Sequence, residues 1–332
     1  MRTIKLLALL IAGTALSPAH AAELKLPRDG WVSWEVAATP GTPAWCCWGP
    51  SQHGHAPPKS CPLDDRSGYG VGDGEHDRTT DTVKIYARLA SGEVDRLQAL
   101  AASCPVETKS PVQDLGKVSG EDSARWLIDR ARKDGGTRRS IGEDAMAALA
   151  MHEVPVAGEA LANFARTDAR VETRKSALFW LAELRGEQGA QVVSAAMFAD
   201  ADPQVREHAS FAITQSKSTH MAADLIRLGN TDKVSKVRQQ AWFWLSQSEA
   251  PEAEAALNHA LRNDADDHVR EQAIFALSQL PEERATRALI AVAEDRSLSR
   301  EQRRRAVFWL SQSDSDSSRA YLEKILASTA AR

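Results

Sequence analysis

Long hydrophobic runs are missing from this 332-residue sequence beyond its N-terminus. After the stretch from Leu6 to Leu16, no segment approaches the roughly 18 apolar residues that a membrane span requires, so we expect none. A positive charge excess is also missing, because 41 Lys and Arg stand against 45 Asp and Glu. Clustered basic residues provide the general affinity for nucleic acid, so this balance excludes nucleic acid as the expected partner.

Motifs of catalysis are missing as well. The sequence contains no G-x-S-x-G nucleophile elbow and no H-E-x-x-H zinc helix. Its glycine-rich stretch from Gly68 to Gly74 has no helical pattern after it that could complete a phosphate site, so we interpret it as a loop. We therefore predict a protein that is not an enzyme and that needs no cofactor.

Cysteine is scarce, and all four cysteines lie in the first third of the chain. The neighbours Cys46 and Cys47 would be strained if bonded to each other. We expect each of them to form a disulfide with one of Cys61 and Cys104, in an order that the sequence leaves open. The alternative is a metal site built from Cys46, Cys47, His53, His55 and Cys61. Oxidation in an exported protein would remove its thiolates.

The N-terminus has the pattern of a secretory signal. Arg2 and Lys5 precede the apolar stretch, and Ala19-His20-Ala21 fits a signal-peptidase site. We predict a signal peptide at residues 1–21 and a bacterial, periplasmic location for the mature protein. Removing the two basic residues leaves 39 basic against 45 acidic residues, a formal charge of 39 − 45 = −6.

Residues 22–105 are rich in Gly, Pro and Trp and show strand-like alternation. One alternating run extends from Trp31 to Val36, and two others, around Val83 to Leu89 and Val94 to Ala99, flank Ser91-Gly92 as in a β-hairpin. We predict a small β-domain that depends on its disulfides for order. We predict that residues 106–120 form a linker.

From residue 121 to 332 the composition changes to that of helices, and the sequence repeats itself. One ladder of residues recurs at steps of 32, 32, 32, 32 and 33: Ala145, Ala177, Ala209, Ala241, Ala273 and Ala306. A second has the same steps: Leu161, Val193, Leu225, Leu257, Leu289 and Leu322. Such a period indicates an α-solenoid of about six two-helix units.

The second helix of each unit begins at a turn such as "ADADPQVR" (residues 199–206), where Asp is suited to cap the helix and Pro203 to its first turn. With Val205, Val237 and Val269 counted as position 0, positions 0, 4, 7 and 8 form an apolar face. The segments "DPQVREHASFAI" and "DDHVREQAIFAL" resemble HEAT repeats, in particular the short type of phycobilisome lyases. The resemblance implies a solenoid with a concave face that binds proteins or peptides.

Phenylalanine recurs at position 6 of the second helix, roughly 130° from the core direction, where a polar residue is expected. Gln follows four residues later in most units, so that the two form an i, i+4 pair. We predict a partner-binding set of Phe179, Phe211, Gln215, Phe243, Gln247, Phe275, Gln279, Phe308 and Gln312. Trp180, Trp244 and Trp309 alternate with Ala at position 7 and are interpreted as core residues.

Two interpretations of the phenylalanines stay open. In the first, each ring packs between repeats over the Arg at position 1 (Arg206, Arg238, Arg270 or Arg303), as a cation–π contact. In the second, the rings and amides line a groove for a peptide or helix. The predicted function is a periplasmic binding or scaffold protein for a protein or peptide partner. The alternatives are a metal- or redox-linked sensor or chaperone that acts through the Cys/His-rich loop, and, from the resemblance, a lyase-type chaperone.

Overall fold

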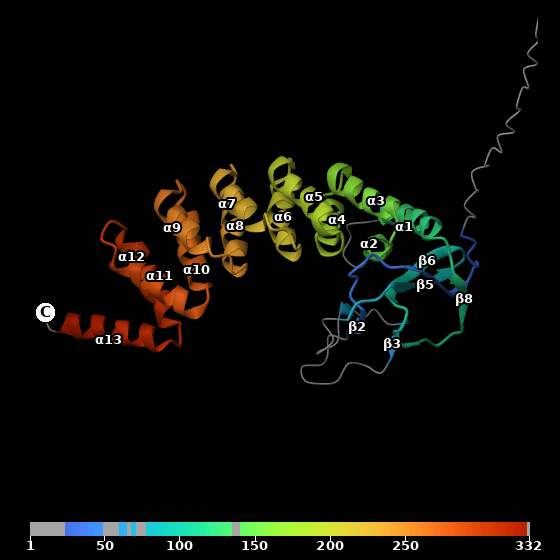
Figure 1. The fold of residues 1–332 in the computed structure, drawn as a ribbon, viewed down its shortest axis with the longest axis horizontal. Coiled ribbons are helices and arrows are strands. Elements are labelled where there is room, and N and C mark those ends of the chain that lie inside the picture. Colours follow the sequence, from blue (N-terminus) through green and yellow to red (C-terminus); the bar gives the residue numbers. More distant parts are fainter. Residues whose placement is uncertain (1–23, 49–59, 65–67, 71–77, 135–139, 331–332) are drawn as a thin grey trace, which may run out of the picture.

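The computed structural model describes residues 24–48, 60–64, 68–70, 78–134 and 140–330. In Figure 1, helix pairs stack side by side in an arc, and the strands gather beneath one end of that arc. The described chain is mainly helical with a small N-terminal sheet, which confirms the predicted fold class. The predicted signal peptide lies outside the described residues.

The strands form one four-stranded sheet and two short pairs. The larger sheet has the order β6-β5-β1-β8, and the pairs are β2 with β4 and β3 with β7. The strand bounds are β1 Gly30–Ala37, β2 Cys46–Trp48, β3 Cys61–Pro62, β4 Gly68–Gly70, β5 Thr82–Ala90, β6 Glu93–Ala101, β7 Val106–Glu107 and β8 Val112–Lys117. The predicted hairpin is confirmed as β5 and β6, whose two-residue turn places Ser91 and Gly92 at positive φ.

The predicted linker at residues 106–120 is wrong, because β7 lies within it and is followed there by β8. This strand pairs in parallel with β1, from Trp31 opposite Val112 to Glu35 opposite Lys117. The alternation in β8 is weak and none of its residues is fully buried, so the sequence pattern gives no strand signal there. The chain therefore passes from the sheet to the first helix almost without a spacer.

The sheet buries side chains on both faces. Val32, Trp34 and Val36 of β1 join a core that continues through the helices as far as Leu310. Trp31 points to the other face, where a second cluster also contains Cys61 and Cys104. The cross-linked region covers only that second face, since the first is covered by the helices α1 (Gly120–Asp134) and α2 (Ile141–Ala150).

The remaining helices follow in pairs. Their bounds are α3 Pro155–Thr167, α4 Val171–Leu184, α5 Gly186–Ala199, α6 Pro203–Gln215, α7 Met221–Thr231, α8 Ser235–Gln247, α9 Ala253–Asn263, α10 Asp267–Ser278, α11 Glu282–Glu294, α12 Arg300–Ser311 and α13 Asp316–Ala330. Among the described helices, none combines the length and the apolar character that a membrane crossing demands.

The second helices of the units, α2, α4, α6, α8, α10 and α12, each contact the next one along the array. The alanine ladder from Ala145 to Ala306 is fully buried at every step. Alanine at this position lets neighbouring helices approach closely, because larger side chains would push them apart. The predicted six helix pairs are thus present, followed by α13.

Caps fix the start of several second helices. Asp202 accepts a hydrogen bond from the Gln204 backbone N–H, and Asp266 accepts one from the His268 backbone N–H, both at 2.8 Å. Pro203 occupies the first turn of α6, as predicted. These caps satisfy N–H groups that the helix itself leaves without a partner.

Buried ion pairs join successive units. Arg174, Arg206 and Arg238, at position 1, each form two hydrogen bonds to an Asp 26 residues later, which is Asp200, Asp232 and Asp264 respectively. Each guanidinium also donates from Nη1, at 2.9 Å, to the backbone carbonyl of the Asp that precedes its own helix. Every arginine therefore holds two consecutive turns together.

The Arg206 and Asp232 side chains are only 5% and 4% exposed. Burial alone would raise the pKa of Asp232, but hydrogen bonds from Arg206 and the Val234 N–H outweigh it and leave that pKa below its usual range. The series ends where the repeat lengthens to 33 residues, because Arg296 takes the place where the next Asp would stand. Asp295 instead binds Arg262.

These ion pairs overturn the expected cation–π contacts. The guanidinium groups of Arg206 and Arg238 are held by carboxylates of the next unit, and within the described residues no arginine at position 1 lies over a phenylalanine of position 6. A charged, bidentate partner is stronger than a ring face.

Replacing Arg206 by methionine should destabilise the array by about 3–5 kcal/mol, because Asp232 would remain buried without its partner. Arg304→Met is the matched control, since Arg304 is 72% exposed, and should change stability by less than about 0.5 kcal/mol. Urea unfolding measures both. Adding Asp232→Leu to Arg206→Met should recover part of the loss; a double variant no more stable than the single one would contradict this account.

A buried hydrogen-bond chain joins the sheet to the helices. Nε1 of Trp34 in β1 donates to Oγ of Ser123 in α1 at 2.8 Å, and this hydroxyl contacts Nε2 of His152 at 2.8 Å. Because the indole can only donate, Ser123 is left to donate its proton to Nε2. Nδ1 of His152 then donates to the Ala148 carbonyl at 2.8 Å. Burial lowers the pKa of His152 to about 4, so the imidazole is neutral.

The free energy of unfolding should fall as the pH drops from about 6.5 towards 4, because the unfolded chain binds a proton at His152 near pH 6.5 and the folded chain only near 4. The expected loss from this residue is on the order of 3 kcal/mol. In His152→Gln the pH dependence should shrink, whereas the exposed control His220→Gln should keep the full slope. Urea titrations at pH 4.5 to 7.5 test this, and parallel profiles for His152→Gln and the unmodified chain would refute it.

Candidate partner-binding face

Aromatic rings form a continuous row along the second helices. We call it the aromatic ladder and define it, in order of contact, as Trp180, Phe179, Phe211, Trp244, Phe243, Phe275, Trp309 and Phe308. Ring centroids of successive members are 4.9 to 6.2 Å apart. This is the range in which aromatic pairs attract each other, so the rings hold neighbouring units together.

The ladder has a period of two units. Phe179 stacks on Phe211 with 9° between the ring planes, and Phe243 stacks on Phe275 with 1°. Trp244 lies between these stacked pairs, at 4.9 Å from both Phe211 and Phe243. Tryptophan and alanine alternate at position 7, so the full pattern recurs only at every second unit.

The partial burial of the rings shows that the two interpretations of the phenylalanines are compatible. Most ladder rings are partly exposed, and Phe308 is 49% exposed where no further second helix follows. The rings therefore pack between repeats, through other rings rather than through arginine, and still leave edges on the surface. The tryptophans, predicted as core, lie half-buried within the ladder.

Glutamine side chains follow the rings at position 10, as the sequence predicts. Gln215, Gln247, Gln279 and Gln312 are all exposed. In three of the four units a chain of hydrogen bonds holds the amide: Nε2 of Gln279 donates to Oγ of Ser278 at 3.1 Å, and this hydroxyl donates to the Phe275 carbonyl at 2.6 Å. Gln215 with Thr214, and Gln312 with Ser311, repeat the arrangement. The held amides leave Oε1 as a fixed acceptor.

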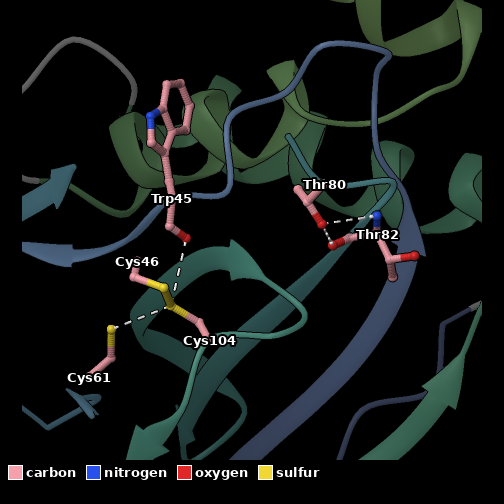
Figure 2. Close-up of a disulfide and its surroundings, with 6 residues drawn as sticks. All are labelled: Trp45, Cys46, Cys61, Thr80, Thr82 and Cys104. Carbon is pink, nitrogen blue, oxygen red and sulfur yellow. Dashed lines mark hydrogen bonds between the residues drawn. A yellow bond between two sulfur atoms is a disulfide. The ribbon is translucent and has the colours of Figure 1, made fainter. Parts of the chain in front are cut away.

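The N-terminal region adds a ring that the prediction missed. The ring of Trp45 lies 5.8 Å from that of Trp180, in a T-shaped contact between the sheet region and α4. The Trp45 carbonyl accepts a hydrogen bond from the Ala101 N–H at 2.9 Å. Its neighbour Cys46 forms a disulfide with Cys104, and Figure 2 shows the Trp45 ring directed away from the sulfur atoms. A tryptophan beside cysteine in a polar segment is the only sequence signal for this role.

The disulfide settles part of the cysteine prediction. Cys46 is bonded to Cys104, one of the two expected partners, and no cysteine is free among those that the structure describes. The alternative metal site is wrong for Cys46, because a bonded sulfur is not a thiolate. His53 and His55 lie outside the described residues, and so does the Cys47 side chain.

Comparisons with known proteins agree with the repeat. Residues 231–304, which contain α8 to α11, match the family model of HEAT repeats. The chain therefore contains HEAT repeats. No curated protein matches the sequence.

Two solved structures resemble this HEAT-repeat chain weakly. Human deoxyhypusine hydroxylase in complex with glycerol is 19% identical over 58% of this chain and 75% of that one, with a TM-score of 0.31. The complex of CpcE and CpcF of phycocyanin lyase from Nostoc is 18% identical over 58% and 83%, with a TM-score of 0.28. Scores this low support no inference about activity.

Ring stacking predicts how stability depends on the position in the HEAT array. Phe243→Ala should cost about 2–3 kcal/mol, because it removes contacts with Phe275 and Trp244. Phe308→Ala should cost less than about 1 kcal/mol, since that ring is half exposed and has fewer neighbours. A double-mutant cycle of Phe243 and Phe275 should give a coupling of about 0.5–1.5 kcal/mol, measured by urea unfolding. Equal losses for Phe243→Ala and Phe308→Ala would show that the stacked pairs add nothing.

Proposed function

We propose that this HEAT-repeat protein is a periplasmic binding or scaffold protein that recognises a protein or peptide along the aromatic ladder and the glutamine row. The observation that carries the proposal is the combination of ring edges and glutamine amides at the same two helix positions in successive units, with three of the four amides held by a neighbouring hydroxyl. Aromatic side chains beside hydrogen-bonding groups are typical of the residues that dominate binding energy at interfaces.

Rigidity supports a binding role. The rings are held by each other, and three of the four glutamine amides are held by a neighbouring hydroxyl. A surface whose side chains are already ordered loses little conformational entropy when a partner binds. The periplasmic location rests on the signal pattern of residues 1–21, and the disulfide between Cys46 and Cys104 is in keeping with an oxidising compartment.

The alternative functions have less support. A redox or metal role would need reactive thiols, whereas Cys46 is bonded to Cys104. Within the described residues no group of three or more His, Cys, Asp or Glu side chains is arranged to hold a metal ion. A lyase-type chaperone activity would rest on the repeat alone.

Affinity capture from the exported fraction of the native cell tests the proposal. Partners retained by the unmodified protein should be lost with Phe211→Ser, because the substitution removes a ring from the ladder. Phe198→Ser is the matched control: this half-buried phenylalanine lies on the first helix α5, under the guanidinium of Arg227, and the variant should retain the partners. Loss of the same partners from both variants, or from neither, would contradict a binding role for the ladder.

A further inference from the structure

Two pockets built on the same pair of rings lie along the ladder. The first, which we call the Phe211 pocket, has a volume of about 600 Å³ and contains Phe211, Trp244, His208 and Gln240. The second, the Phe275 pocket, has a volume of about 570 Å³ and contains Phe275, Trp309, His268 and Gln272. In each, a phenylalanine meets the tryptophan of the next unit, with centroids 4.9 and 5.0 Å apart and planes tilted by 46° and 49°.

The recurrence follows from the two-unit period. A pocket of this kind needs a phenylalanine followed by a tryptophan in the next unit, and alanine at position 7 of α6 and α10 leaves room beside the ring. The junction between Phe179 and Phe211 has no such tryptophan, and there the two phenylalanines stack instead. The chain thus presents the same pair of rings twice.

The pocket rims are electrically balanced. Lys236, which lines both pockets, binds Glu207 at 3.3 Å, and Arg305 binds Glu271 at 3.5 Å beside the second. Lys175, at the edge of the first pocket, is paired with Glu172 at 2.9 Å. Burial lowers the pKa of His208 to about 4, so its ring carries no charge at neutral pH. Each pocket thus has aromatic rings at its base and paired charges at its edge, and this combination complements an uncharged, bulky apolar side chain.

Hydrogen-bonding capacity remains one helical turn beyond the phenylalanine of each pocket. Oε1 of Gln215 and of Gln279 is a fixed acceptor, because each Nε2 is held by the hydroxyl of Thr214 or Ser278. Such acceptors suit the backbone N–H groups of an extended chain. An α-helix has already used its own N–H groups, so it can satisfy these acceptors only through side chains.

The distance between the pockets limits the spacing of the anchors. Trp244 is linked to Trp309 through Phe243 and Phe275 by centroid steps of 4.9, 6.1 and 5.0 Å. The two indoles therefore lie at most about 16 Å apart, whereas same-face residues of an extended strand lie about 13 Å apart at i, i+4 and about 20 Å apart at i, i+6. Of these two spacings, i, i+4 lies within that limit and i, i+6 exceeds it.

We propose that the HEAT array binds an extended, uncharged peptide segment of its partner that inserts bulky apolar side chains from positions i and i+4, one into the Phe211 pocket and one into the Phe275 pocket. This proposal rests on the function proposed above and specifies the register. The intervening residues lie along the glutamine row, where backbone N–H groups donate to Oε1 of Gln215 and Gln279.

Synthetic peptides test the register directly. The probes are fluorescein-labelled nine-residue peptides of Ser and Thr that carry two leucines at i, i+4 or at i, i+6, or a single leucine, and binding to the full chain is followed by fluorescence polarisation. The i, i+4 peptide should bind at least tenfold more tightly than the other two. Equal dissociation constants for all spacings, or no binding of any peptide, would overturn the proposal.

Two changes test the contacts without disturbing the ring stack. N-methylation of the peptide backbone between the anchors should weaken binding of the i, i+4 peptide several-fold, because it removes N–H donors. The exposed pair Gln215→Ala and Gln279→Ala should do the same and should abolish the difference between methylated and plain peptide. A persistent difference in that double variant would contradict the assigned acceptors.

The peptide and capture experiments together distinguish a failure of the peptide register from a failure of the proposed binding function. If the peptides show no dependence on spacing while Phe211→Ser still loses the captured partners, the ladder binds a partner in some other register. If Phe211→Ser retains every partner, the binding function itself fails.

Discussion

The buried pair of arginine and aspartate between successive units is the interaction on which the rest of this structure depends. Each guanidinium binds the turn before its own helix and the carboxylate of the next unit, so it fixes both the distance and the rotation from one second helix to the next. Rings at position 6 can stack at about 6 Å only if that step is constant. The aromatic ladder is therefore a consequence of the ion pairs and the buried alanines beneath it.

The sequence predicts the array well, because its signals are local and repeated. Alanine, valine and phenylalanine recur at fixed positions of a 32-residue period, and each of these positions has the same surroundings in every unit. The period thus predicts helices, faces and rows of side chains. It also predicts that the phenylalanines lie away from the core, which their partial exposure confirms.

Contacts between residues that are distant along the chain could not be predicted in the same way. The pairing of β8 with β1 joins segments about 80 residues apart, and β8 has no strong alternation of its own. Trp45 reaches Trp180 across a still longer separation. The choice of aspartate over phenylalanine as the partner of Arg206 depends on the geometry of the turn, which the period does not specify.

The candidate site joins two kinds of order that have different causes. Hydrophobic burial and stacking place the rings, while short hydrogen-bond chains from Ser or Thr orient the amides beside them. Balanced ion pairs at the pocket rims keep the surface near electrical neutrality. Long-range electrostatic attraction would therefore contribute little to binding of the proposed partner, and shape complementarity would contribute most. The proposed partner would therefore be selected by fit rather than by charge.

The alternation of tryptophan and alanine at position 7 makes two repeats, not one, the smallest piece of this array that can be gained or lost without damage. Deleting 64 residues would bring a tryptophan-bearing helix next to an alanine-bearing one, as before. Deleting 32 would set two large indoles, or two small methyl groups, against each other, and leave either a clash or a void. Gene duplications that lengthen such a protein are therefore expected to add two repeats at a time.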